Sequence, residues 1–278
     1  MKRSLNEFLF IGFLSFPFFI LLFHIQNLQI PVGWDWFGVL SYSLLQAGLS
    51  AAISLFFGFL GALGLLKIKS QKIFRFFEWV LLLPAFVPQV VIISSVLTII
   101  TPLKLEFRGL MPVIFIHIIM NAGMCAVAIE RVFQTKLKEC MDLATLDGVR
   151  RWIFHWKVSI PMLIGELKIL FAMVFAFCIT SFGVPLLVGS SKMSLEVLIY
   201  EKMKLNHNWS EAILLAFIQM FLILFLLWPL GKTKSENFKE AWSRTSAFGV
   251  LGGILPLLLF TGMVFIGLVW GVEQGVHA

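Results

Sequence analysis

Long uninterrupted apolar runs constrain this chain more than any other feature of its sequence. A helix needs about 20 apolar residues to cross a bilayer, and its backbone polar groups are then satisfied within the segment. With 59% hydrophobic and only 13% charged residues, the 278-residue chain has too little polar surface to cover a water-soluble globule. The sequence therefore predicts an all-α, polytopic transmembrane helical bundle solvated by lipid.

Seven apolar runs are long enough to span a membrane. They are Phe8 to Gln26, Gly38 to Leu66, Phe77 to Thr101, Gly109 to Arg131, Pro161 to Val188, Glu211 to Leu230 and Ser246 to Gly271. The first resembles a signal peptide, but no small-residue cleavage pattern follows its long run, so we interpret it as a retained helix. We expect about six core helices within residues 1–231, a linker at 232–245, and one extra C-terminal span with a short tail at 246–278.

The basic residues indicate the orientation of these spans. Short cytosolic loops are enriched in Lys and Arg, and most of the 22 basic residues fall on one side of the membrane if the N-terminus is cytosolic. An odd number of spans then places the C-terminus outside. The net charge of +7 is accounted for by this topology and by contact with anionic lipid headgroups, so it does not indicate a nucleic-acid partner.

The longest polar interruption is the polar loop, residues 132–160, on the predicted cytosolic side. It begins as an amphipathic helix, and Gly148 suits the left-handed position that ends a helix. A short aromatic turn with Trp152 and Trp156 follows, and Pro161 suits the first position of the next membrane helix. The expected order is helix, sharp stop, short helix and return to the membrane.

Two uses of this loop are open from the residues alone. It can lie on the bilayer surface with Trp152 and Trp156 as headgroup anchors, or its apolar face can dock in the groove of another protein. Amphipathicity does not say what covers the apolar face, so both interpretations stand at this point.

The spacing of the loop resembles that of the conserved cytoplasmic loop in permease subunits of bacterial binding-protein-dependent ABC importers. Asp142, Leu143 and Ala144 fall at that family's Glu-Ala-Ala positions, and Gly148 falls at its Gly. Val158 falls at its Ile, and Ile160-Pro161 at its Leu-Pro. The segments Phe177 to Gly189 and Ser194 to Tyr200, with Leu83-Pro84 and Pro88, are similar to the thiamine and ferric-ion permeases of the family.

The resemblance implies a transport subunit of the bacterial inner membrane, possessing no enzymatic activity or cofactor of its own. Its partners would be a cytosolic ABC ATPase dimer, an external substrate-binding protein, and a second permease half or a second copy. The implied ATPase-coupling residues are Met141, Asp142, Leu143, Ala144, Gly148, Val158, Ile160 and Pro161. Thiamine or ferric ion is the implied cargo. The chain resembles the first half of a fused permease plus one helix, which leaves open a fragment, a split gene product or an extra terminal helix.

Candidate residues for the translocation path lie within the spans. His117, Asn121 and Met124 share one side of the fourth span, and Ser181 lies in the fifth. Polar groups at membrane depth face a protein interior or a water-filled path. The favoured interpretation is interhelical hydrogen bonding by His117 and Asn121, with Met124 and Ser181 contributing to helix packing. The five histidines are scattered with no ligand spacing, so we expect no metal site.

Two rival functions remain as alternatives. An ion-coupled secondary transporter would need intramembrane charges, whereas the charges here cluster at span ends. An intramembrane enzyme would need a nucleophile and a base at matched depth, and no Gly-x-Ser-x-Gly element is present, although His117 is a candidate base. Gly231-Lys232 lacks the earlier glycine of a phosphate-binding loop, so we expect ATP hydrolysis in a separate subunit.

Overall fold

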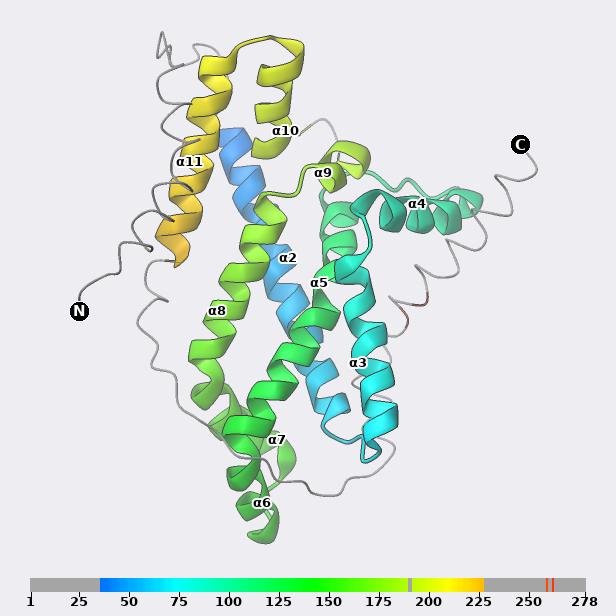
Figure 1. The fold of residues 1–278 in the computed structure, drawn as a ribbon, viewed down its shortest axis with the longest axis vertical. Helices are drawn as coiled ribbons and strands as arrows, with labels where there is room; N and C mark the ends of the chain where they lie inside the picture. Colours follow the sequence, from blue (N-terminus) through cyan, green and yellow to red (C-terminus); the bar gives the residue numbers. More distant parts are fainter. Residues whose placement is uncertain (1–35, 190–191, 228–258, 260–261, 263–278) are drawn as a thin grey trace, which may run out of the picture.

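The protein is an elongated helical bundle in a computed structural model that describes residues 36–189, 192–227, 259 and 262 (Figure 1). All regular secondary structure in these residues is helical. The predicted span Phe8 to Gln26 and the linker at 232–245 lie outside the described residues, and of the predicted span Ser246 to Gly271 only residues 259 and 262 are described. The all-α fold class predicted from the sequence is confirmed for the part that the structure describes.

Four described helical stretches are long and apolar enough to cross a membrane: Phe37–Leu65, Leu110–Leu146, Arg151–Ile179 and Trp209–Leu226. They contain the helices α2 (Trp36–Leu65), α5 (Leu110–Val132), α8 (Ile160–Ile179) and α11 (Trp209–Leu227). A fifth candidate is a bent pair, α3 (Gln71–Phe86) with α4 (Gln89–Ile100) and the 3-10 turn η1 (Thr101–Leu103). The structure therefore has the membrane helices expected for residues 38–66, 109–131 and 211–227.

The sequence-based prediction of a straight span from Phe77 to Thr101 is wrong. α3 and α4 meet at 99°, and the residues between them, Val87 and Pro88, have extended backbones. Proline disfavours helical geometry in the residue before it, and this restriction breaks the helix at Val87 although the run stays apolar. Pro84 lies inside α3 without breaking it.

The predicted span from Pro161 to Val188 is also interrupted. α8 ends at Ile179, and a separate short helix, α9 (Gly183–Val188), follows the break. The Ser181 hydroxyl donates to Gln89 Oε1 at 3.3 Å, which ties this break to the start of α4. Both interruptions therefore lie together at one end of the bundle, where Figure 1 shows α4 beside α9.

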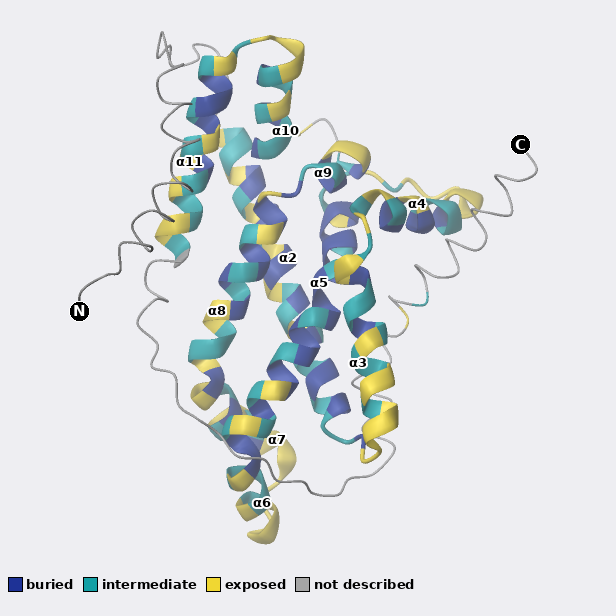
Figure 2. Cartoon of the chain, in the orientation of Figure 1, coloured by how far each residue is buried: buried dark blue, intermediate teal, exposed yellow. Residues whose placement is uncertain are grey.

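α5 is the central helix and has more buried residues than any other described helix (Figure 2). It packs against α2, α3 and α8, and small residues permit this close approach. A Cβ on Gly123 would lie 1.9 Å from the Leu81 carbonyl oxygen, and a Cβ on Gly58 would lie 2.4 Å from Cys125 Cβ. The lack of a side chain at Gly58 and Gly123 is therefore what allows α5 to lie so close to α2 and α3.

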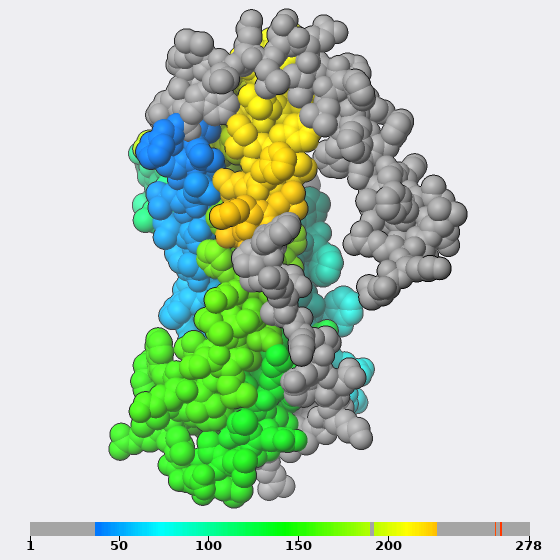
Figure 3. All heavy atoms as spheres, turned by 90° about the vertical axis from the view of Figure 1, so that its left-hand side faces the viewer, coloured from blue at the N-terminus to red at the C-terminus, as the bar shows by residue number. Residues whose placement is uncertain are grey.

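The two ends of the bundle differ. At one end lie α4, α9 and α10 (Leu195–Tyr200), and the π-helical turn η4 (Glu201–Leu205) leads from α10 to α11. At the other end the polar loop carries α6 (Lys138–Leu146) and α7 (Arg151–Phe154), which protrude beyond the other helices (Figure 1). On one face α11 lies beside α2 and α8 (Figure 3).

Candidate functional site

The polar loop turns at Gly148, as the sequence predicted. Gly148 has a φ of +67°, the left-handed conformation that favours glycine. Its N–H donates to Thr145 O at 3.3 Å, and the Val149 N–H donates to Ala144 O at 2.9 Å. These two bonds form a Schellman motif, which satisfies the last carbonyls of α6 and fixes the direction in which the chain leaves.

The loop is a continuation of two membrane helices. α6 follows α5 through a π-helical turn, η2 (Phe133–Leu137), and α7 leads into α8 through another, η3 (His155–Ser159). The short helix predicted after the stop corresponds to α7, which continues through η3 into α8 as one helical stretch. Pro161 has no N–H to donate within the helix. At the residue before it, the Ile160 N–H donates to the carbonyl oxygen of His155, five residues back. Such a shift in hydrogen bonding is one way in which a helix passes a proline.

An aromatic cluster joins the two π-helical turns to each other and to α2. The Phe133 ring lies 6.0 Å from the His155 ring and 5.8 Å from the Phe59 ring, measured between centroids. Lys136 pairs with Glu166 beside this cluster, so η2 is also tied to α8. Sequence reasoning did not select Phe59, Phe133 or His155, because three aromatic residues far apart in the chain carry no local spacing signal.

Large apolar side chains are exposed on the outer surface of the loop, among charged residues such as Arg150 and Lys157. Leu143 is 62% exposed and Trp152 is 70% exposed, and the Trp152 and Trp156 rings pack edge to face at 5.4 Å. Leu146 and Ile153 are exposed as well. An exposed apolar group of this kind at the protruding end of a bundle is typical of a surface that another molecule covers.

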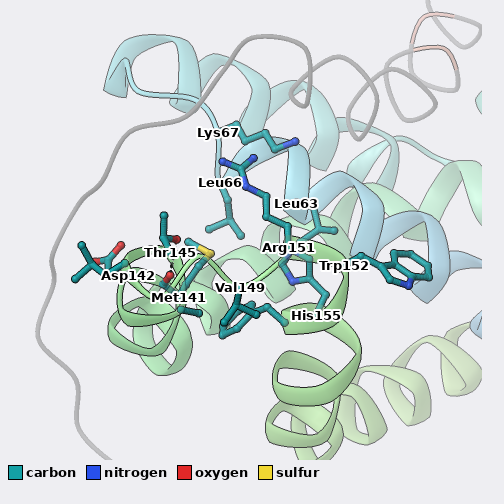
Figure 4. Close-up of a pocket in the computed structure, with 13 residues that line it drawn as sticks. Leu63, Leu66, Lys67, Met141, Asp142, Thr145, Val149, Arg151, Trp152 and His155 are labelled. Carbon is teal, nitrogen blue, oxygen red and sulfur yellow. Dashed lines mark hydrogen bonds between the residues drawn. The ribbon is translucent and has the colours of Figure 1, made fainter.

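A cavity of about 570 Å³ lies between the loop and the end of α2 (Figure 4). Of the predicted coupling residues it brings together Met141, Asp142 and Ala144. Leu143 and Gly148 are exposed beside the cavity, on α6 and at its end. Val158, Ile160 and Pro161 do not line it and lie instead where η3 joins α8.

A buried polar cluster connects α2, α5 and α8 in the core. Ser50 Oγ and His117 Nδ1 are 3.2 Å apart, and Asn121 Nδ2 donates to His117 O at 2.8 Å. Asn121 Nδ2 also lies 3.7 Å from Cys178 Sγ, while Gln46 Nε2 donates to Cys178 O at 3.1 Å. His117 is only 1% exposed. These contacts agree with the interhelical bonding that the sequence favoured, and a role in the translocation path stays a prediction.

The remaining path candidates lie apart from this cluster. Met124 is half-buried and packs against apolar core residues. Ser181 lies at the break between α8 and α9. Among the residues that the structure describes, no group of three or more His, Cys, Asp or Glu is placed to hold a metal ion.

Comparison with known proteins supports the resemblance found in the sequence. No family model matches the chain. It is 26% identical over 121 residues to the thiamine transport system permease protein ThiP of Escherichia coli (strain K12), an alignment covering 43% of this chain and 23% of that protein. Against ThiP of Brucella abortus (strain 2308) the identity is 26% over 151 residues, covering 50% and 26%. The chain thus spans about a quarter of the length of these relatives.

The fold is also similar to that of a chain in a bacterial ABC transporter involved in the import of the acidic polysaccharide alginate. The TM-score is 0.65 with 15% identity, covering 83% of this chain and 94% of that one. A crystal structure of the alginate transporter in complex with its alginate pentasaccharide-bound periplasmic protein gives a TM-score of 0.64, also with 15% identity, covering 81% and 89%. The bundle has the fold of an ABC importer permease.

Proposed function

We propose that this chain is the permease subunit, or half of the permease, of an ATP-driven ABC importer of the inner membrane. The main support for this proposal is the similarity in fold to a chain of the alginate importer, which covers 83% of this chain. The partial similarity to thiamine permeases supports it, and so does the polar loop, whose capped turn at Gly148 lies at the end of two continuous membrane helices.

The geometry suggests how the loop would act. A separate cytosolic ATPase dimer would hold the exposed surface of α6, including Leu143. Because α6 continues into α5 and α7 into α8, a displacement of the turn at Gly148 moves both membrane helices against α2. Such rigid-body movement changes which side of the membrane the path opens to, which is alternating access.

Further partners follow from the same proposal. A single bundle does not enclose a path, so a second permease half or a second copy of the chain would complete it. An external substrate-binding protein would deliver cargo at the end that carries α4, α9 and α10, and the basic residues at the loop end agree with a cytosolic location for the loop. Thiamine is the cargo that the names of the relatives suggest. The suggestion that ferric ion is the cargo rests on the sequence resemblance alone.

Two substitutions in the loop test the proposal. Asp142→Lys reverses a charge at the cavity, and Gly148→Trp replaces the left-handed glycine at the turn. We expect both to reduce association with the cytosolic ATPase and to abolish ATP-dependent uptake in proteoliposomes. Glu106→Lys is the control for ATPase association, because it reverses an exposed charge on the segment between η1 and α5, at the opposite end of the bundle from the loop. Unchanged association and uptake in both loop variants would show that the loop does not couple to an ATPase.

A further inference from the structure

The cavity between α2 and the polar loop combines basic and apolar groups in a way that the proposed coupling role does not use. Its polar lining includes Lys67 at the end of α2, and Arg151 and His155 on the α7 side. Figure 4 shows Lys67 and Arg151 on the same side of the cavity, while Asp142 and Thr145 lie on the other side.

Lys67 and Arg151 are close enough to repel each other. Partial burial lowers the pKa of the Lys67 ammonium below its usual value, and the Arg151 guanidinium lowers it further. The three ion pairs found among the described residues involve other side chains. Two cations on one side of the cavity, with Asp142 on the other side, give the first side a positive potential that an anion would neutralise.

The walls around these cations are apolar. Leu63, Leu66 and Phe154 line the cavity, together with Trp152 at its edge. A ligand that suits both surfaces has a compact anionic head and an apolar body. A phosphate group meets the first requirement, since it accepts hydrogen bonds from guanidinium and ammonium groups together.

We infer that the cavity between α2 and the polar loop binds a phosphate ester through Lys67 and Arg151. The apolar walls favour the headgroup of an anionic phospholipid as its source over a free phosphate. Since the cavity is bounded by α6, an occupant would hold the turn at Gly148 against α2. The inference goes beyond the proposed function, because the purified chain would bind the ligand without any ATPase.

Native mass spectrometry of the purified full chain in neutral detergent tests the inference, with phosphatidylglycerol as the probe. We expect retained phosphatidylglycerol, and a roughly thirtyfold weaker affinity in the double variant Lys67→Gln with Arg151→Gln, as loss of two basic contacts predicts. Lys69→Gln with Arg150→Gln is the matched control, because it removes the same charge from exposed neighbours outside the cavity and should bind as the parent does.

Two further arms make the result decisive. Lys67→Arg with Arg151→Lys keeps the charge, so it should retain binding and would show that the loss in the Gln variant is not a failure to fold. If glycerol phosphate displaces the lipid, the site binds a free phosphate ester. If it does not displace the lipid, the site is specific for the phospholipid. Equal retention of zwitterionic phosphatidylcholine, or equal weakening in the cavity and control variants, would overturn the inference.

Discussion

At the scale of single residues, Gly148 determines the shape of the polar loop. Its φ of +67° is costly for any residue with a β-carbon, while a Cβ at this position would meet nothing within 4 Å. The need for glycine is therefore a matter of backbone conformation and not of space. A single glycine followed by an aromatic turn was enough for the sequence to predict this feature, because helix termination is local chemistry.

Substitution of Gly148 should separate these two causes. We expect Gly148→Val to destabilise the end of α6 by about 1–2 kcal/mol, because valine resists the left-handed conformation. Gly148→Asn should cost less, since asparagine adopts that conformation more readily. Hydrogen exchange at the amides of residues 148 and 149, which donate the two capping bonds, measures the effect. Equal exchange in the two variants would contradict the backbone explanation.

The buried polar cluster makes a second prediction at this scale. Ser50→Ala removes the partner of His117 Nδ1 and should lower stability by about 0.6 kcal/mol, the average for a hydrogen bond between membrane helices. Ser94→Ala, on the exposed side of α4, should leave stability unchanged. Thermal unfolding in detergent compares the two variants. If Ser50→Ala were no more destabilising than Ser94→Ala, the cluster would not be holding α2 against α5.

At the scale of helices, the close contacts of glycines define how the bundle packs. α2 offers a matched pair, because Gly58 faces Cys125 while Gly48 has nothing within 4 Å of its Cβ position. We expect Gly58→Ala to destabilise the bundle by about 1–3 kcal/mol through overpacking. Gly48→Ala should be neutral or stabilising, because alanine is the better helix former. Thermal unfolding of both variants is the measurement, and equal melting temperatures would refute the close approach of α2 and α5.

The ion pair between Lys136 and Glu166 tests how the loop is held to the membrane helices. Both side chains are partly exposed, so Glu166→Lys should cost roughly 1 kcal/mol or less. The exchanged pair, Lys136→Glu with Glu166→Lys, should recover most of that loss. Stability of the two variants is compared by thermal unfolding. A double variant no more stable than the single one would show that the pair does not join η2 to α8.

The helix breaks mark the limit of what apolarity alone can predict. The runs at Phe77 to Thr101 and Pro161 to Val188 stay predominantly apolar across the breaks, so a hydropathy argument treats each as one span. Pro88 occurs at the first break, yet Pro84 lies inside α3 without breaking it. The residues at the two breaks are joined by a tertiary contact, the bond from Ser181 to Gln89, which no local pattern reveals. The π-helical turns likewise coincide with aromatic contacts between distant residues, which carry no local pattern.

At the scale of the whole molecule, the two ends of the bundle serve different purposes in the proposed importer. The loop end continues two membrane helices and carries exposed apolar side chains, while the opposite end carries the broken helices. Length and composition predicted the membrane class and the loop spacing predicted the permease fold. The residues of the path could not be predicted, because in the proposed importer a second permease half would contribute part of that path.

The central claim is that an ATPase subunit covers the exposed surface of the polar loop. The most direct measurement places a photo-activated cross-linking residue at Leu143, which is 62% exposed, and a second one at Ile164 in α8, which is 47% exposed. In membranes containing the full transporter, we predict that the probe at position 143 forms a covalent product with the cytosolic ATPase and the probe at 164 does not. Lipid products alone at position 143 would contradict the claim and would place the loop on the bilayer surface instead.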